Sequence, residues 1–354
     1  MNTENKLIIG MPAGSLANAS RGGNLIDLLD SAGFKTSGYQ NGGPTSFNAS
    51  HNFIGWDGRP QEFGAQLADK EIDVAIAGDD WIKERVLELK YEYNRDVKLH
   101  KVLSLNRGGV KLVGIIHPEA KENTTSEALK RFSQSSPLIK VVSEMPYMAL
   151  NWIKERLKES GLSEDYQDFS VQKYGTPSKI KKGVVIYETW GKTEAKVKHG
   201  SADIGLEITQ SGSAIRNYGL KIIDKIMQSE TGIWVNHDIS QNQEKMNLLK
   251  MFLLNLNGAI NAETKVLLVF NVPNTQIKQI ESYLKDHNLY ADEPTMNEGR
   301  DFSEYSIQLN IEDNNLPLAR VRYELTELGA INLDTVPISS SIPNINLDDL
   351  DVLV

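Results

Sequence analysis

Short apolar runs alternate with amphipathic segments along the first part of the chain. The expected strands are 6–12, 72–78 and 110–118. Apolar residues recur at helical spacing between these runs, and the expected helices are 24–33, 62–71 and 79–89. Alternation of strands and helices predicts a parallel or mixed sheet with helices on both of its faces.

The same pattern begins again at residue 137. Residues 137–161 give a strand, a polar loop, an amphipathic helix and a closing glycine, and strands follow at 182–189 and 202–209. This restart predicts a second α/β lobe.

The last third of the chain has a different rhythm. A polar segment at 236–247 is followed by a helical segment at 248–260. Beyond it the expected strands are 265–273, 290–296, 304–312 and 331–339, and the expected helices are 275–288 and 317–330. This order is typical of the split β-α-β arrangement of a small ferredoxin-like (ACT-like) α+β domain.

These patterns predict two α/β lobes followed by one α+β domain. The expected division is lobe I at 1–106 and 220–236, lobe II at 107–219, a linker at 237–264, the ferredoxin-like domain at 265–345 and an acidic-apolar tail at 346–354.

Composition narrows the class of protein. The 354 residues are 40% hydrophobic and carry a formal net charge of -9, which disfavours a nucleic-acid-binding protein because phosphate backbones require a basic face. The chain has no cysteine, which excludes thiol nucleophiles and fits a reducing cytoplasm. We expect no signal peptide and no membrane span, since no apolar run approaches about 18 residues. The six histidines show no metal-ligand spacing.

One segment suggests a site for an anion. The apolar strand that ends at Ile208 runs into Thr209, a cluster of small hydroxylated residues around Gly212, and a helix-forming segment with Arg216. Backbone N–H groups at such a helix start lack partners and attract phosphate. The alternative is a plain turn with a helix cap, for which Ser, Thr and Gly are also preferred.

The segment "ADIGLEITQSGSAIRNYGL" resembles the signature of the ATP phosphoribosyltransferases, which reads roughly A-D-x-x-x-D-x-V-E-T-G-x-T-L-R-x-N-G-L. Residues 58–82 are similar to the family's R-P-Q-D-I-P…D-L-G-I-T-G-E-D-L block, and "VVSEMPYMALNWI" is similar to its T-E-Y-P-N-L block. The last hundred residues look like the regulatory domain of the long-form enzymes. The resemblance is collinear over nearly the whole chain.

The resemblance implies an enzyme that joins N1 of ATP to C1 of phosphoribosyl pyrophosphate, with Mg²⁺ present and pyrophosphate released. It implies two lobes folded like a periplasmic binding protein. The implied catalytic residues are Arg59, Glu207 and Lys111, and Glu207 is also the implied metal contact. The implied phosphoribosyl pyrophosphate contacts are Thr209, Gln210, Ser211, Gly212, Ser213, Ala214 and Ile215, and the implied nucleotide contacts are Gly14, Ser15, Arg21, Asp79 and Asp80.

Several of these positions allow a second interpretation. Asp79 and Asp80 begin a helix, and acids there stabilise any helix. Arg21 either replaces a cation of the family's loop or is a solvated side chain. The tryptophans at 56, 152 and 190 either stack on a base or belong to the core.

The sequence also departs from the family. The family's first loop reads P-K-G-R-L, whereas residues 12–16 read P-A-G-S-L, so that both cations are missing. Glu207 stands where the family has Asp, Gln210 where it has Glu, and Ala214 where it has Thr. Loss of the acid at Gln210 affects the expected contacts to the ribose hydroxyls.

Three functions therefore stay open. The first is an ATP phosphoribosyltransferase of the cytoplasm, inhibited by histidine and assembled as a hexamer or dimer, with neither nucleic acid nor membrane as a partner. The second keeps the phosphoribosyl donor but uses another nitrogen heterocycle as acceptor. The third is an inactive paralogue that binds a nucleotide or an amino acid and regulates a partner.

Overall fold

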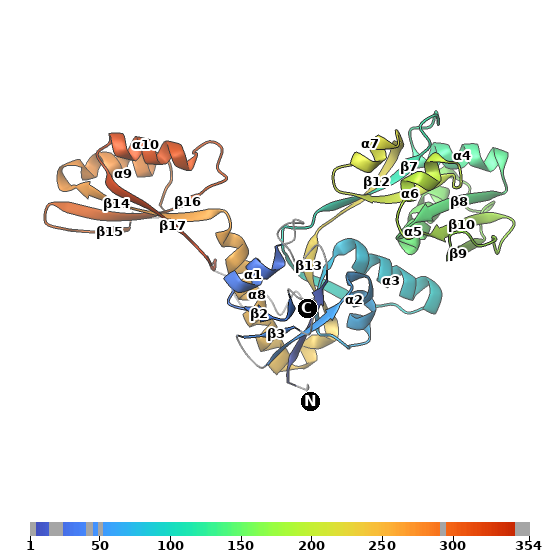
Figure 1. Cartoon of the computed structure of the whole chain (residues 1–354), viewed down its shortest axis with the longest axis horizontal. Coiled ribbons are helices and arrows are strands. Elements are labelled where there is room, and N and C mark those ends of the chain that lie inside the picture. Colours follow the sequence, from blue (N-terminus) through green and yellow to red (C-terminus); the bar gives the residue numbers. More distant parts are fainter. Residues whose placement is uncertain (1–4, 14–23, 40–44, 49–51, 291–294, 344–354) are drawn as a thin grey trace. The chain divides into compact units, whose positions relative to one another are not determined.

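The computed structural model describes residues 5–13, 24–39, 45–48, 52–290 and 295–343. The chain divides into two compact units, and the second unit comprises residues 26–36 and 247–349. The first unit contains two sheets and the second contains one (Figure 1). No helix among the described residues has the length and apolar character needed to cross a bilayer.

The first sheet of the first unit forms lobe I. Its order is β2-β3-β4-β1-β5-β13-β6, with β1, β4 and β5 parallel and β13 antiparallel to both β5 and β6. The strands are β1 (Leu7–Pro12), β2 (Thr36–Ser37), β3 (Ser46–Phe47), β4 (Phe53–Gly58), β5 (Val74–Gly78), β6 (Leu99–Ser104) and β13 (Thr231–Asn236). Helices α2 (Pro60–Ala68) and α3 (Asp79–Tyr93) pack against each other, and Phe63, Leu67 and Ile82 join them to the core of the sheet.

The second sheet forms lobe II. Its order is β12-β7-β11-β8-β10-β9, with β11, β8, β10 and β9 parallel and β7 antiparallel to its neighbours. The strands are β7 (Val110–Ile116), β8 (Leu138–Ser143), β9 (Phe169–Lys173), β10 (Gly183–Glu188), β11 (Ile204–Thr209) and β12 (Lys221–Ser229). Helices α4 (Thr125–Ser135) and α5 (Pro146–Ser160) share one core with the sheet, and α6 (Thr193–Lys198) and α7 (Ser213–Asn217) share a second core with its other face.

Two crossings connect the lobes. One is residues 105–109 between β6 and β7, and the other is Glu230 between β12 and β13. The crossings pair with each other, since Thr231 N–H donates to the Arg107 carbonyl and Leu105 N–H donates to the Thr231 carbonyl, both at 2.9 Å. Together with the packing of α3 on α5, they hold the two lobes in one unit.

One difference from the predicted lobe boundaries lies at residues 220–236. We expected 220–236 to lie wholly in lobe I, but β12 pairs with β7 of lobe II from Lys221 to Ser229. The reason is that one continuous segment, residues 221–236, supplies a strand to each of two sheets and changes sheet at Glu230. Its composition does not mark this point.

The second unit contains the ferredoxin-like domain, as predicted. Its strands are β14 (Lys265–Pro273), β15 (Thr295–Asn297), β16 (Phe302–Asn310) and β17 (Ile331–Pro337), and its helices are α9 (Ile277–Asp286) and α10 (Leu318–Glu327). The sheet order is β15-β16-β14-β17, as a split β-α-β arrangement requires. Fully buried Phe270 and Tyr305 stack with ring centroids 5.7 Å apart inside its core.

The expected linker at 237–264 is largely a helix. The short 3₁₀ turn η3 (His237–Gln241) precedes α8 (Gln243–Ala262), which buries Leu249, Leu256 and Ala259. Helix α1 (Leu25–Ser31) was expected in lobe I, but it groups almost entirely with the second unit. Phe34, which follows α1, packs edge-to-face on Phe252 of α8 with the two ring centroids 5.0 Å apart. This contact explains why α1 groups with the second unit. The predicted tail at 346–354 lies outside the described residues.

Candidate functional site

Two cavities lie in the first unit near the carboxyl ends of its parallel strands, which is where open α/β sheets bind ligands. The first, of about 520 Å³, adjoins both crossings, and we call it the crossing cavity. It is lined by Asp79, Gly109, Val110, Lys111, Gln210, Gln228, Ser229 and Glu230. The second, of about 550 Å³, we call the acidic cavity. It is lined by Arg59, Gln61, Glu62, Trp81, Glu84, Arg85, Glu88, Glu144, Pro146, Tyr147, Val171, Glu188, Thr189 and Trp190.

The crossing cavity brings together three predicted site residues from distant parts of the sequence. Lys111 near the start of β7 pairs in register with Thr209 at the end of β11, so its exposed side chain lies beside the expected phosphate loop. Gln210 follows Thr209, and Asp79 begins α3. All but Thr209 line the same cavity.

The expected phosphate loop is closed by its own hydroxyl groups. The Thr209 hydroxyl accepts a hydrogen bond from Gly212 N–H at 2.8 Å, and the Ser211 hydroxyl accepts one from Ser213 N–H at 3.3 Å. Arg216 donates to the Ser211 carbonyl at 2.8 Å. Gly212 has a φ of 72°, a left-handed conformation that glycine adopts without strain.

The side chain of Ile215 corrects one prediction. We expected a ligand contact, but this side chain is 2% exposed and belongs to the core between the sheet of lobe II and α6. It anchors α7, whereas Ser211 and Ser213 are exposed on the loop and Ala214 is partly buried.

Glu207 lies on β11, and its carboxyl group is close to two other glutamates. Burial, together with the nearby carboxylates of Glu194 and Glu144, raises its pKa to about 8. Its buried Oε2 atom has no hydrogen-bond partner among the described residues. The described part of the chain contains no group of three or more His, Cys, Asp or Glu residues arranged to hold a metal ion.

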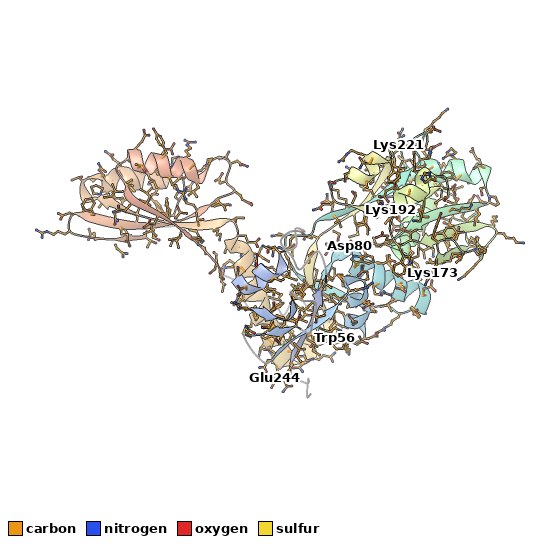
Figure 2. All side chains as sticks on the ribbon, viewed as in Figure 1. Trp56, Asp80, Lys173, Lys192, Lys221 and Glu244 are labelled. Atoms are coloured by element: carbon orange, nitrogen blue, oxygen red, sulfur yellow. The ribbon has the colours of Figure 1, made fainter. Side chains whose placement is uncertain are left out.

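Asp79 and Asp80 have structural partners at the crossing. Asp79 forms an ion pair with Lys101 at 2.9 Å and accepts a hydrogen bond from Glu230 N–H at 3.2 Å. Asp80 is only 4% exposed, and its carboxylate accepts a hydrogen bond from the Ser229 hydroxyl at 2.9 Å. Figure 2 labels Asp80. Our prediction of a nucleotide contact is thus wrong for the buried Asp80 side chain, which instead fastens α3 to the crossing.

Arg59 is separated from the crossing cavity. Arg59 occupies the N-cap position of α2, is exposed, and lines the acidic cavity rather than the crossing cavity. Gly14, Ser15 and Arg21 lie outside the described residues.

The tryptophans divide between the two interpretations. Trp152 is a core residue, 2% exposed, whose indole donates to Asp224 at 2.9 Å. Trp56, labelled in Figure 2, is 44% exposed. Trp190 is 81% exposed at the acidic cavity, where an aromatic ring is available to a ligand.

Sequence reasoning missed the acids of the acidic cavity. Glu84 is 6% exposed, and its carboxyl group accepts the N–H groups of Tyr147 and Met148 from the first turn of α5. Burial raises its pKa to about 8. Its position four residues after Asp80, on the same helix face, was the available signal.

The family model and the sequence relatives point to the same family. A family model described as ATP phosphoribosyltransferase matches residues 59–257, more than half of the chain. The ATP phosphoribosyltransferase of Solibacter usitatus is 28% identical over 288 residues, covering 77% of this chain and 80% of that protein. The ATP phosphoribosyltransferase of Trichlorobacter lovleyi is 27% identical over 351 residues, covering 95% and 99%.

A similar solved structure is the ATP phosphoribosyl transferase (HisG:HisZ) complex from Thermotoga maritima. The matched chain is 13% identical with a TM-score of 0.48, and the match covers 71% of this chain and 98% of that one.

Proposed function

The chain belongs to the ATP phosphoribosyltransferase family, and we propose that its crossing cavity is where N1 of ATP is joined to C1 of phosphoribosyl pyrophosphate. The bond from C1 to the pyrophosphate oxygen breaks as the bond from C1 to N1 forms, and pyrophosphate leaves. This reaction is the first step of histidine biosynthesis.

One observation carries the proposal. Lys111, Gln210 and Asp79, expected at the site from three separate segments, line one cavity beside the signature loop. Transfer of this kind needs two substrates held in line and few covalent partners. A cavity at the crossings, with a cation at its wall and the Ser/Gly loop following Gln210, is suited to holding a phosphorylated sugar.

The loop would hold the 5-phosphate through its backbone. The N–H groups of Gly212 and Ser213 are directed to the hydroxyls of Thr209 and Ser211. A phosphate oxygen is a stronger acceptor than a hydroxyl because it is charged. We expect the donor to take over these N–H groups and the freed hydroxyls to donate to it.

The departing pyrophosphate requires positive charge. Lys111 supplies a flexible ammonium group at the crossing cavity, and preorganised cations of this kind stabilise charge that develops in the transition state. This role needs no side chain to exchange a proton with the reacting atoms.

We extend the proposal to Mg²⁺. The buried, unpartnered Oε2 atom of Glu207 fits a cation or a ribose hydroxyl, and Glu207 is the residue that would hold the metal. The ion would neutralise pyrophosphate charge. Burial raises the pKa of Glu207 to about 8, so Mg²⁺ would have to displace a proton from this carboxyl group, and in its protonated form Glu207 would instead donate to a ribose oxygen.

The ferredoxin-like domain suggests regulation. We propose that it binds histidine as a feedback inhibitor and that the enzyme works in the cytoplasm as a hexamer or dimer. Unchanged turnover at saturating histidine would contradict the inhibition, and a monomer in sedimentation at working concentration would contradict the assembly.

The decisive assay uses the full chain with phosphoribosyl pyrophosphate, Mg²⁺ and ATP. We expect pyrophosphate release together with the ultraviolet absorbance of N1-ribosylated adenine. Release only with another heterocycle would instead support a different acceptor, and nucleotide binding without any release would indicate an inactive paralogue.

A further inference from the structure

The lining of the crossing cavity carries more negative than positive charge. Asp79 and Glu230 are its acids, and Lys111 is the one lysine among the described residues that line it. The phosphoribosyl donor brings a 5-phosphate and a pyrophosphate group, and carboxylates at short range repel such charge unless a cation balances them. A cavity that binds this donor therefore needs a further cation close to the two acids.

Lys101 is the cation that faces both acids. Its ammonium group lies 2.9 Å from the Asp79 carboxylate and 2.9 Å from the Glu230 carboxylate, so it bridges them. The Ser104 hydroxyl donates a further hydrogen bond to Glu230 at 2.6 Å. The Lys101 side chain is only 23% exposed, and solvent and salt screen a partly buried pair less than a surface pair.

Hydrogen bonding keeps this pair charged. Burial lowers the pKa of Lys101, but the hydrogen bonds with Glu230 and Asp79 together raise it overall. The hydrogen bonds from Ser104 and Lys101 lower the pKa of Glu230. At neutral pH an ammonium group therefore faces an ionised carboxylate at the wall of the cavity.

The sheet of lobe I leaves a path for this lysine. Lys101 lies on β6, Asp79 follows β5, and β13 lies between these two strands. The lysine crosses β13 over Gly232, where an added Cβ would clash with the Cε atom of Lys101. The absence of a side chain at position 232 therefore allows Lys101 to reach Asp79 from a strand that is not adjacent to β5.

The two acids also have a structural task at the second crossing. Glu230 is the single residue between β12 of lobe II and β13 of lobe I. Its N–H donates to the Asp79 carboxylate at 3.2 Å, and its carbonyl accepts the Asp79 N–H at 3.2 Å. The acids thus hold the crossing to the start of α3, which explains why a cavity suited to an anion contains them.

We propose that Lys101 is a positioning residue of the crossing cavity, where it balances the charge of Asp79 and Glu230 and fixes both carboxylates. The ammonium group of Lys111 then acts on an anionic ligand without competition from these acids. Lys101 acts through the acids, since it does not itself line the cavity. The identity of the donor rests on the proposed function, but the affinity of the cavity for a polyphosphate can be measured without turnover.

The test measures the binding of inorganic pyrophosphate to the full chain by calorimetry at low salt. In Lys101→Met the two acids lose their counter-charge, and we expect about tenfold weaker binding. In Glu230→Gln one acid is removed while the lysine remains, and we expect binding to tighten by about two- to fivefold. The double variant should return to within about threefold of the parent.

A merely structural role predicts a different pattern. Each single substitution breaks the same Lys101–Glu230 pair, so a role in structure alone would weaken binding in both variants, and the double variant would be no better. Equal weakening in the two single variants, or unchanged affinity in folded Lys101→Met, would overturn the proposal. Failure of the parent chain to bind pyrophosphate at millimolar concentration would overturn it too.

Two further variants separate charge from folding. Lys101→Arg keeps the charge and should bind pyrophosphate within about threefold of the parent. Lys245→Met breaks another partly buried pair, that of Lys245 with Asp73 at 2.7 Å, and neither residue lines the cavity. It should lose stability and keep its affinity.

The pyrophosphate-release assay is run separately and decides the proposed function. A chain that shows the expected pattern of pyrophosphate binding but releases none from the donor would refute the transferase and keep the role of Lys101. A chain that releases pyrophosphate equally well in the parent and in Lys101→Met would refute the role of Lys101 alone.

Discussion

The buried carboxyl group of Glu84 in α3 accepts a 2.7 Å hydrogen bond from the backbone N–H of Met148 in the first turn of α5. The neighbouring N–H of Tyr147 donates to its other oxygen at 2.9 Å. An acid from lobe I therefore satisfies the open start of a helix in lobe II, a position where negative charge is favoured. This contact, with the two crossings, defines how the lobes meet.

Removing Glu84 should destabilise the first unit. In Glu84→Ala the N–H groups of Tyr147 and Met148 lose their acceptor in a buried position, which costs about 1–3 kcal/mol per unsatisfied group. Urea unfolding followed by circular dichroism measures the change. Lys83→Ala, an exposed position one residue earlier in the same helix, is the control and should stay within about 0.5 kcal/mol of the parent.

Glu84 also makes stability depend on pH. Its pKa is raised by burial from 4.5 to about 8 in the folded protein, so the folded state binds this proton more tightly than the unfolded chain. The resulting stabilisation is complete below about pH 4.5 and is lost as the pH rises toward 8. Glu207, with its pKa raised to about 8, acts in the same direction.

We therefore expect Glu84→Gln to flatten this decline. The amide keeps one acceptor and faces the other N–H with a donor, so the variant is less stable at pH 5 but loses less stability by pH 8.5. Urea unfolding at four pH values across this window is the measurement. A slope equal to that of the parent would show that Glu84 is ionised in the folded state.

Replacing Gly212 by valine tests whether the signature loop binds the phosphate of the donor. A valine there must adopt a φ of 72° and would place its Cβ 3.0 Å from Arg216. We expect about 1–2 kcal/mol of destabilisation from the left-handed conformation and at least tenfold weaker binding of phosphoribosyl pyrophosphate, measured by calorimetry.

The control for this change is Gly175→Val. Gly175 has a φ of 83° with no atom within 4 Å of an added Cβ, so it carries a similar backbone penalty away from the signature loop. It should lose stability and keep affinity. If both variants bind the donor equally well, the phosphate does not lie on the Gly212 loop.

How far the sequence predicts the structure depends on the range of the interactions. The helix expected at 79–89 is the first part of α3, and the order of strands and helices in the ferredoxin-like domain could be predicted. Both depend on periodicity and caps, which act locally. The change of sheet at Glu230 could not be predicted from the sequence, since it depends on the pairing of β12 with a strand about a hundred residues earlier.

The same limit applies to the site. Lys111 and Gln210 were predicted from the resemblance, and the fold brings them to one cavity. Glu84 was missed because its hydrogen-bond partners lie 63 and 64 residues away. Asp80 was misread because its carboxylate meets Ser229 only after the crossings form, at a separation of 149 residues.

Lys111 is the cation whose removal tests the crossing cavity most directly. Its exposed side chain contributes no buried contact, so Lys111→Ala should leave the unfolding free energy within about 0.5 kcal/mol of the parent. If the ammonium group stabilises charge on the departing pyrophosphate, the turnover number falls about ten- to a hundredfold. The Michaelis constant for ATP then changes by a smaller factor than the turnover number. Steady-state pyrophosphate release with each substrate varied in turn gives both parameters.

The matched control is Lys225→Ala, which removes an exposed lysine from β12, the other strand that pairs with β7. Lys225 does not line the crossing cavity, so its loss changes the net charge of the protein equally while leaving the cavity intact. Turnover that falls equally in both variants would mean that overall charge, and not the position of Lys111, governs the rate. A fall confined to Lys111→Ala places the pyrophosphate beside the start of β7, because an ammonium group acts on developing charge only at close range in a solvated cleft.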